Sequence, residues 1–497
     1  MTHIPFKVSL LRLVFLLLPV TVAAQEARLS DYVDPRIGSE GLGRVFIGPS
    51  CPYGMVKPSP DCTVHPNSGW LPMPEQVNGF SQVHVSGTGG GPKYGNILVM
   101  PFGKGMDQLN HIDYRKDETI RLGYYATEFQ RTGIYTEITT APRASFYRFT
   151  YPEDSLKSLL VDAGFFLGEQ PTPDAREAQQ FVGSEIQIIS DHEVMGYTRI
   201  RGGWNNGRAY TVYFYAVTDH PFVQTTTWKG NQISNERYQP DSQQKTGALL
   251  RFPSSANTIQ LKVGISFISS LKARENVWNE IPHWSFEDTR QALLAQWENL
   301  LQRIDIASNT PEKYKRMFYT GIYHTMLMPV DRTGENPLWS DPEPYYDDFY
   351  AIWDTYRTST PLITLIDPQR ETDIVRSLIN IYKRDSSGLL VSQGVRAKTV
   401  SDLVVPKERK LQLNAKPYYQ LIEIKGTAFE RGKRYGSSAS GAIKRNIDFY
   451  SSAFEKSANI DWPQAQKLAM KFLPVIEKYC PPYVEEMKGI AEGSGKG

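Results

Sequence analysis

The feature that most constrains the fold is a long succession of short strand patterns, separated by turn residues, from about Leu29 to about Ser270. Segments such as "YTVYFYAV" and "SEIQIIS" are rich in aromatic and β-branched residues, and clusters such as "RGGWNNGR" separate them. The segment "TIQLKVGISF" alternates cleanly and places four apolar residues on one face: Ile259, Leu261, Val263 and Ile265. Many strands at this spacing without helical crossovers predict an antiparallel β-sandwich and disfavour a doubly wound nucleotide-binding fold.

The hydrophobic period changes to that of helices between about 285 and 385. The segment "PEKYKRMFYTGIYHTML" has Thr310 as a candidate N-cap before Pro311 at the first helical position. Asp367 is likewise a candidate N-cap before Pro368. The second of these helices carries an amphipathic face made of Ile374, Leu378, Ile381 and Tyr382. Further helical patterns run from about 417 to the end of the chain.

The first residues, "MTHIPFKVSLLRLVFLLLPVTVAAQ", have the organisation of a secretory signal peptide. Lys7 and Arg12 precede an apolar run that ends in small residues, which predicts cleavage before Gln25. The run is short for a membrane span and no second one follows, so we expect a secreted or periplasmic protein with no membrane span. The net charge of +2, without a long basic block, gives no reason to expect nucleic acid as a partner.

The chain has three cysteines. An oxidising compartment would allow Cys51 to pair with Cys62, although their spacing leaves this open. Zinc is disfavoured because neither Cys-x-x-Cys nor His-Glu-x-x-His occurs. We interpret Cys480, inside a helical pattern and followed by two prolines, as a packing residue.

The stretch "GFSQVHVSGTGGGPKYGN" concentrates five glycines after one histidine in the middle of the strand-rich region. It is not a phosphate loop, because Lys93 is followed by Tyr94 and Pro92 stands where a dinucleotide motif needs its third glycine. The glycines either let the backbone approach a ligand or supply the positive φ angles of a turn before the strand "NILVMPF". Residue chemistry alone leaves both interpretations open.

Two side chains of this stretch are candidate site residues. His84 alternates with Gln82 and Ser86, so the three project from one face of a strand. The simpler interpretation of His84 is a hydrogen-bonded histidine of a sheet.

Trp353 and Asp354 in "FYAIWDTYRT" form a second candidate pair. In one interpretation the tryptophan packs in a core and the carboxylate pairs with Arg357. In the other, the ring stacks on a sugar and the carboxylate accepts its hydroxyl protons.

Four ordered motifs resemble the glycoside hydrolase family 92 exo-α-mannosidases. They are "YVDPRIGSEGLGRVFIGPSCPYGMVKPSPD", "GFSQVHVSGTGGGPKYGNILVMPFG", "MFYTGIYHTMLMP" and "YAIWDTYRTSTPLITLIDPQRETDIVRSLINIY". The resemblance, over about residues 30–385, implies an N-terminal β-sandwich packed on an (α/α)6 toroid. It also implies that His84, Ser86, Trp353 and Asp354 bind a terminal mannose of a glycan.

The same resemblance implies calcium as cofactor and hydrolysis with inversion. Inversion requires one carboxylic acid and one carboxylate about 6.5 to 9.5 Å apart. In the family these groups and the metal ligands lie further along the toroid, beyond the part that this chain matches. We therefore expect a truncated toroid whose catalytic residues are unknown and which has no metal ligands.

The C-terminal segment resembles a different family. "YYQLIEIKGTAFERGKRYGSSASGAIKRNIDFY" and "FLPVIEKYCPPYVEEMKGIAEGSG" are similar to the beginning of isopenicillin-N acyltransferase-like amidohydrolases. The resemblance implies a cysteine nucleophile at a new N-terminus, but no Gly-Cys cleavage site occurs in the segment.

These interpretations divide the chain into five parts: a signal peptide (1–24), a β-sandwich (25–275), a linker helix with the start of the toroid (276–390), a junction (391–416) and a helical acyltransferase-like fragment (417–497). The expected function is an exported mannosidase acting on terminal α-linked mannose, with α-1,2 as the expected linkage. The alternative is a non-catalytic carbohydrate-binding remnant or fusion product. Amide hydrolysis by the C-terminal part is a third, weaker hypothesis.

Overall fold

The computed structural model describes residues 28–41, 43–63, 68–88, 91–169, 178–203, 205–350, 352–384, 391–392, 395–396 and 422–495. The predicted signal peptide and most of the predicted junction lie outside these residues. The chain divides into two compact units, Met1–Val405 and Pro406–Gly497, which are described separately.

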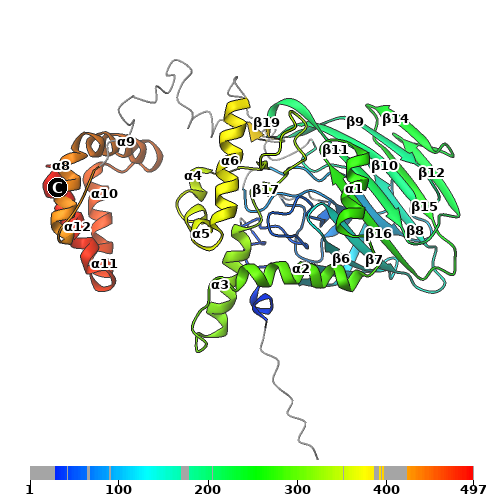
Figure 1. Ribbon diagram of the computed structural model, residues 1–497, viewed down its shortest axis with the longest axis horizontal. Helices are drawn as coiled ribbons and strands as arrows, with labels where there is room; N and C mark the ends of the chain where they lie inside the picture. The colour runs from blue at the N-terminus through cyan, green and yellow to red at the C-terminus, as the bar shows by residue number, and fades with distance from the viewer. Residues whose placement is uncertain are drawn as a thin grey trace, which may run out of the picture. The chain divides into compact units, whose positions relative to one another are not determined.

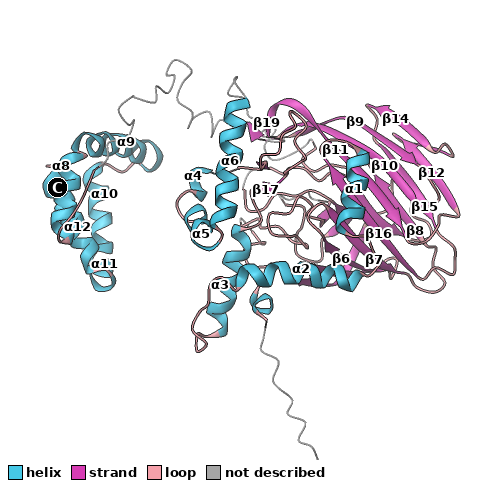
Figure 2. Ribbon diagram, in the orientation of Figure 1, coloured by secondary structure: helices cyan, strands magenta, loops and turns pink. Residues whose placement is uncertain are grey.

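The first unit is built on an antiparallel sandwich, as the sequence predicts (Figures 1 and 2). In its described residues fifteen strands form one continuous path, in which β2 pairs with both β3 and β4, and a sixteenth strand, β1, pairs with β2 beside this path. One layer contains β1 (Ser59–Cys62), β2 (Gln76–Ser81), β3 (Leu98–Phe102), β8 (Ser158–Asp162), β12 (Gln224–Lys229), β13 (Gln232–Ser234) and β15 (Thr246–Arg251). The other contains β4 (Asp113–Arg121), β5 (Tyr124–Phe129), β6 (Tyr135–Thr140), β7 (Ala144–Thr150), β9 (Gln179–Ile188), β10 (Glu193–Gly202), β11 (Asn205–Thr218), β14 (Tyr238–Ser242) and β16 (Thr258–Ser266).

Strand β16 shows how the alternation of the sequence becomes a core. Its four apolar residues on the predicted face are fully buried: Ile259, Leu261, Val263 and Ile265. The opposite face is also covered, because α1 (Ser270–Glu280) packs on it. A side chain at Gly264 would place its Cβ 2.4 Å from the carbonyl oxygen of Ala273. The close approach of α1 therefore requires a glycine at this point of the strand.

The helical part of the first unit begins at Ser270, earlier than the change of period at 285 suggests. Ser269 caps α1 by accepting the N–H of Lys272. The remaining helices are η1 (Leu29–Tyr32), α2 (Phe286–Leu301), α3 (Glu312–Thr325), α4 (Ile352–Thr355), α5 (Ser359–Ile366) and α6 (Pro368–Arg384). A second buried cluster joins η1, α2, α3, α5 and α6 around Trp297 and Tyr323, whose ring centroids are 5.1 Å apart.

Two details of the predicted helices are wrong. Pro311, not Thr310, is the N-cap of α3, since its ψ of 139° keeps it outside the helix. In α6, which starts at Pro368 as predicted, Ile374 and Ile381 are buried, but Tyr382 is 47% exposed. Two-residue strands complete the first unit: β17 (Val330–Asp331) pairs with β18 (Tyr346–Asp347), and β19 (Val391–Ser392) with β20 (Val395–Arg396).

The second unit is helical, in agreement with its sequence pattern. It contains α8 (Ala428–Ser438), α9 (Ser440–Ala458), α10 (Trp462–Ala469), η3 (Met470–Phe472), α11 (Leu473–Tyr479) and α12 (Pro481–Ser494). Helices α8 and α12 touch backbone to backbone, since a Cβ at Gly432 would lie 2.0 Å from the carbonyl oxygen of Glu486. Cys480 lies between α11 and α12 and is exposed, so its interpretation as a packing residue is wrong.

The other two cysteines are buried and unpaired. Cys51 belongs to the cluster around Trp297, and its sulfur lies 3.9 Å from the carbonyl oxygen of Thr140. Cys62 belongs to the sandwich core and accepts the N–H of Leu71 at 3.2 Å. The disulfide that the sequence left open is therefore not formed.

Within the part of the chain that the structure describes, no helix combines the length and the apolar character that a membrane crossing requires.

Candidate functional site

The glycine-rich stretch contains the positive φ angles that one of its two interpretations, a turn before the next strand, requires. Gly87 and Gly95 adopt positive φ angles of 63° and 72°, and Tyr94 shares this conformation at 58°. A Cβ at Gly95 would lie 2.4 Å from the Cγ of Leu167. The backbone therefore turns tightly against its neighbours before β3 begins at Leu98.

His84 is buried in a closed hydrogen-bond network. Its Nε2 lies 2.8 Å from Oδ1 of Asp61, and its Nδ1 lies 2.6 Å from the carbonyl oxygen of Lys57. Both partners are oxygen acceptors, so each ring nitrogen faces one of them. Gly69 covers the pair, because a Cβ there would lie 2.3 Å from Asp61 Oδ1. This geometry favours the simpler interpretation of His84 as a hydrogen-bonded histidine. Residues 82–86 follow the end of β2 and form no strand, so the prediction that Gln82, His84 and Ser86 project from one face of a strand is wrong.

The same network differs from a nucleophilic triad. The hydroxyl of Ser81 lies 3.3 Å from His84 Nε2, the nitrogen that already faces Asp61. In a triad the serine and the acid occupy opposite nitrogens of the imidazole ring. This arrangement cannot relay a proton away from Ser81.

Ser86 connects the glycine-rich stretch to the segment that follows α3. Its hydroxyl accepts the N–H of Phe46 at 3.2 Å, and its own N–H donates to the sulfur of Met328 at 3.3 Å. Ser86 is half-buried. Its contacts place it at the boundary between the sandwich and the helical part of the first unit.

A buried charged cluster links the sandwich to the helical part of the first unit. Arg332 donates to Oδ2 of Asp347 at 3.1 Å, to Oδ2 of Asp348 at 2.9 Å and to the hydroxyl of Tyr94 at 3.1 Å. Tyr94 in turn donates to the other oxygen of Asp348. Burial and then the Asp348 carboxylate hold the pKa of Tyr94 well above its usual value, so this hydroxyl remains a donor.

Trp353 and Asp354 follow this cluster on the short helix α4. Trp353 is 60% exposed, and Asp354 is exposed beside it. The N–H of Arg357 donates to the main-chain carbonyl of Asp354 at 3.1 Å. The expectation of a core tryptophan is therefore wrong, and the described contact between Asp354 and Arg357 is a main-chain bond, not an ion pair.

The structure thus joins the predicted site residues indirectly. Among the described residues, the hydrogen bonds of the glycine-rich stretch reach Met328, Arg332 and Asp348, not Trp353 or Asp354 themselves. Sequence reasoning missed Asp61, Tyr94, Arg332 and Asp348. The run "YYDDF" directly before "YAIWD" is the signal that could have identified the two acidic residues.

The described residues do not fit the calcium ion that the resemblance implies. They contain no group of three or more His, Cys, Asp or Glu side chains arranged to hold a metal. The adjacent carboxylates Asp347 and Asp348 are both engaged by Arg332. Calcium needs six to eight oxygen ligands, which this arginine-bound pair cannot supply.

Two family models match the chain in succession. The glycosyl hydrolase family 92 N-terminal domain matches residues 32–266, and the glycosyl hydrolase family 92 catalytic domain matches residues 272–398. The chain belongs to glycosyl hydrolase family 92. The matched ranges cover the sandwich and the helical part of the first unit, which together hold the four predicted site residues.

Individual relatives agree with this membership. An uncharacterized secreted glycosidase of Arthroderma benhamiae is 30% identical over 374 residues, which are 68% of this chain and 46% of the relative. The family GH92 α-mannosidase BT3965 of Bacteroides thetaiotaomicron, also solved in complex with mannoimidazole, superimposes with a TM-score of 0.65 at 25% identity over 73% of this chain and 51% of its own. The GH92 glycosyl hydrolase ccman5 gives 0.62 at 25% identity over 71% and 49%. The chain spans about half the length of these relatives.

Proposed function

We propose that this protein is an exported glycoside hydrolase of the α-mannosidase type, acting on terminal α-linked mannose of glycans. Support comes from the two family models and from the likeness to an α-mannosidase solved with mannoimidazole. Release with inversion and a preference for α-1,2 linkages are part of the proposal. Export is supported by the predicted signal peptide and by the relative described as secreted.

The single observation that carries the proposal is the exposed pair Trp353–Asp354 on α4. An exposed indole can stack on the apolar face of a sugar ring, while the neighbouring carboxylate accepts its hydroxyl protons. The Arg332 cluster holds the segment before α4 against the glycine-rich stretch. In the proposed site Trp353 and Asp354 hold the terminal mannose, and His84 and Ser86 belong to the wall that the stretch forms.

The catalytic acid and base are not among these residues. An inverting hydrolysis uses two carboxyl groups about 6.5 to 9.5 Å apart, one to protonate the leaving oxygen and one to activate water. Asp354 is the one carboxylate of the four proposed site residues. Calcium belongs to the proposal through the family alone, and no step is assigned to it here.

This shortage of carboxylates favours a second candidate, binding of mannose without turnover. The exposed pair on α4 would then hold a sugar, and no bond would be cleaved. Amide hydrolysis by residues 417–497 stays a prediction from the sequence.

The test is mannose release from α-1,2-linked mannobiose by the full chain, with calcium and then with a chelator. The proposal predicts mannose release that both Trp353→Ala and Asp354→Asn lower at least tenfold, and the chelator arm measures whether calcium takes part in it. Tyr314→Ala, which removes an aromatic ring that is 57% exposed on α3, is the matched control and should leave release unchanged.

The outcomes separate the two candidates. Folded protein that binds mannobiose without releasing mannose supports binding alone. Mannobiose affinity that is the same in wild type, Asp354→Asn and His84→Ala would show that the sugar site lies elsewhere.

A further inference from the structure

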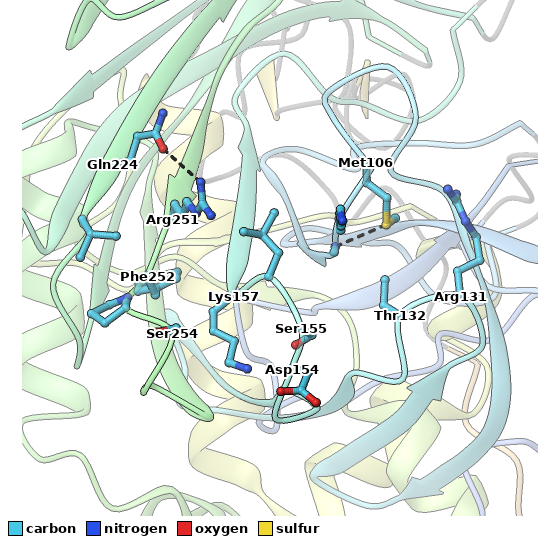
Figure 3. A pocket seen from close by; sticks show the side chains of 15 residues that line it. Met106, Arg131, Thr132, Asp154, Ser155, Lys157, Gln224, Arg251, Phe252 and Ser254 are labelled. Carbon is cyan, nitrogen blue, oxygen red and sulfur yellow. Dashed lines mark hydrogen bonds between the residues drawn. The ribbon is translucent and has the colours of Figure 1, made fainter.

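A pocket of about 940 Å³ opens at one end of the sandwich (Figure 3). Its lining comes from both layers: the residues after β3, the turn between β5 and β6, the loop before β8, the start of β12 and the end of β15. Its volume lies within the roughly 300–1,000 Å³ of small-molecule sites. Neither Trp353 nor Asp354 lines it.

The lining carries an excess of positive charge. Lys104, Arg131 and Arg251 are exposed, and Figure 3 shows the two arginines on opposite sides of the opening. Asp154 is the one carboxylate of the lining. Unless this charge meets an anion, it is a net repulsion concentrated in a hollow with partly apolar walls.

The partners of the two arginines are neutral. Arg131 donates to the carbonyl oxygen of Ile112 and, at 3.5 Å, to Oδ1 of Asn110. Arg251 donates to Oε1 of Gln224 at 3.4 Å. These bonds orient the guanidinium groups, and neither group forms an ion pair within the described residues, which suits recognition of an anionic oxygen cluster. The buried carboxylate of Asp113 lies beside Arg131 and accepts its main-chain N–H at 2.9 Å and the hydroxyl of Thr132 at 3.2 Å.

A fourth cation lies in the wall between them. Lys157 is 1% exposed, and its Nζ donates to the carbonyl oxygens of Pro152 at 2.7 Å and Glu153 at 2.5 Å. Carbonyl groups solvate this ammonium without neutralising it. The electrostatic potential inside the pocket is therefore raised by the buried Lys157 as well as by the exposed cations at the opening.

A second hollow near the N-terminal segment makes the contrast clear. It is lined by several arginines as well, but three of them form ion pairs with carboxylates: Arg36 with Asp34, Arg316 with Glu312 and Arg290 with Glu287. Basic composition alone does not mark a site on this molecule. Arg28 and Arg121 of that hollow form no ion pair within the described residues, so the two hollows differ in how many of their cations are paired and not in whether unpaired ones occur.

The remaining lining combines apolar surface and hydroxyl groups. Phe252 and Met106 are buried beneath the opening, and Thr132, Ser155 and Ser254 line it with hydroxyls. The accessible apolar lining comes from Leu156 and the exposed Val223, and such apolar surface with hydroxyl partners suits a sugar ring. We propose that this pocket binds a sugar that carries a phosphate or sulfate monoester.

This site is separate from the proposed mannose site. Strand β3 begins after the glycine-rich stretch at Leu98 and ends at Phe102, directly before the lining residues Gly103 and Lys104. Five residues of strand span about 13 Å, so the two ends of β3 belong to two different sites. The inference does not rest on the proposed function, because it uses the charge and shape of the pocket alone.

The experiment is isothermal titration calorimetry of the full chain at low ionic strength with four probes: mannose 6-phosphate, mannose 6-sulfate, mannose and inorganic phosphate. We expect at least one of the two esters to bind at least tenfold more tightly than mannose or inorganic phosphate. The tighter ester identifies the substituent. Raising the salt concentration should weaken the binding, because the contacts are electrostatic.

The matched variants are Lys104→Ala/Arg251→Ala and Lys313→Ala/Lys383→Ala. Each pair removes two exposed cations, but Lys313 and Lys383 lie on α3 and α6, outside the pocket. Only the pocket pair should lower ester affinity at least tenfold, and Arg251→Lys should retain most of it.

Three results would overturn the proposal: no ester binding, equal weakening in both double variants, or inorganic phosphate binding as tightly as the esters. Thermal melting of each variant verifies that it is folded.

Discussion

Aromatic side chains are buried in the sandwich and largely exposed in the C-terminal helical unit. Phe80 on β2 is fully buried, and its ring lies 5.9 Å from that of Tyr125 and 6.2 Å from that of Tyr147. In the C-terminal unit Phe472 is 66% exposed and Tyr479 71% exposed. An aromatic residue stabilises a fold only where a second layer covers it, and the helices of the C-terminal unit provide little such cover.

The C-terminal unit gains its closest contact from glycines instead. Gly432 and Gly436 of α8 lie against the backbone of α12, and Gly489 and Gly493 of α12 lie against that of α8. Backbone contact of this kind depends on the absence of side chains. We therefore expect the sandwich to be sensitive to the loss of side-chain volume, and the C-terminal unit to be sensitive to added side-chain volume.

The largest expected effect is that of removing a buried ring. Phe80→Ala should lower the free energy of unfolding of the sandwich by about 3–5 kcal/mol, because it leaves a cavity in a closed core. Phe472→Ala, the matched change at an exposed site, should stay within about 0.5 kcal/mol. Hydrogen exchange of the β2 and α10 amides measures the two units separately. If the two substitutions lower the free energy of unfolding equally, Phe472 is buried in solution and the two units do not differ in this respect.

The next effect is that of adding volume to the glycine contact. A Cβ at Gly489 would lie 2.2 Å from the carbonyl oxygen of Phe429, so Gly489→Leu should separate α8 from α12 and cost about 1–3 kcal/mol. Gly441→Ala in α9 is the control, since its Cβ would meet nothing closer than 3.6 Å and alanine favours helix. We expect the amides of α8 to lose protection from hydrogen exchange in Gly489→Leu but not in Gly441→Ala. If they stay protected in Gly489→Leu, the two helices are not in close contact.

The smallest effect concerns a buried charge of the sandwich. Burial lowers the pKa of Lys57 to about 8, and its Nζ donates to the carbonyl oxygen of Gly54 at 2.6 Å. Between pH 8 and 9 the unfolded chain keeps this proton while the folded chain releases it, so the stability of the folded state should rise with pH, by about 1 kcal/mol.

The control for this effect compares two lysine substitutions. Lys57→Met should lower the rise in stability by the share of Lys57 and leave that of Lys262, whose pKa burial also lowers to about 8, whereas Lys471→Met on the exposed η3 should not change the rise. Urea unfolding at pH 8.0 and 9.0 measures the difference between each variant and the wild type. A rise in Lys57→Met that is as large as in the wild type would contradict the prediction for Lys57.

Much of the fold follows from local pattern. The alternation of "TIQLKVGISF" predicts the buried face of β16, and Pro368 predicts the start of α6, because both depend on neighbours in the chain. The turn in the glycine-rich stretch follows from the φ angles that glycine allows. The amphipathic face of α6 is correct at Ile374 and Ile381 but wrong at Tyr382, which is 47% exposed although Ile381 beside it is buried.

The sequence by itself determined the strand and helix periods, the place of the glycine turn and the family motifs that include the Trp-Asp pair. The tertiary structure decided what each side chain meets: Asp61 beside His84, Arg332 between Tyr94 and Asp348, and four cations around one pocket. Tyr94 and Arg332 lie 238 positions apart in the chain. Period and propensity act over a few residues, whereas such contacts arise from the packing of whole layers, so no local pattern contains them.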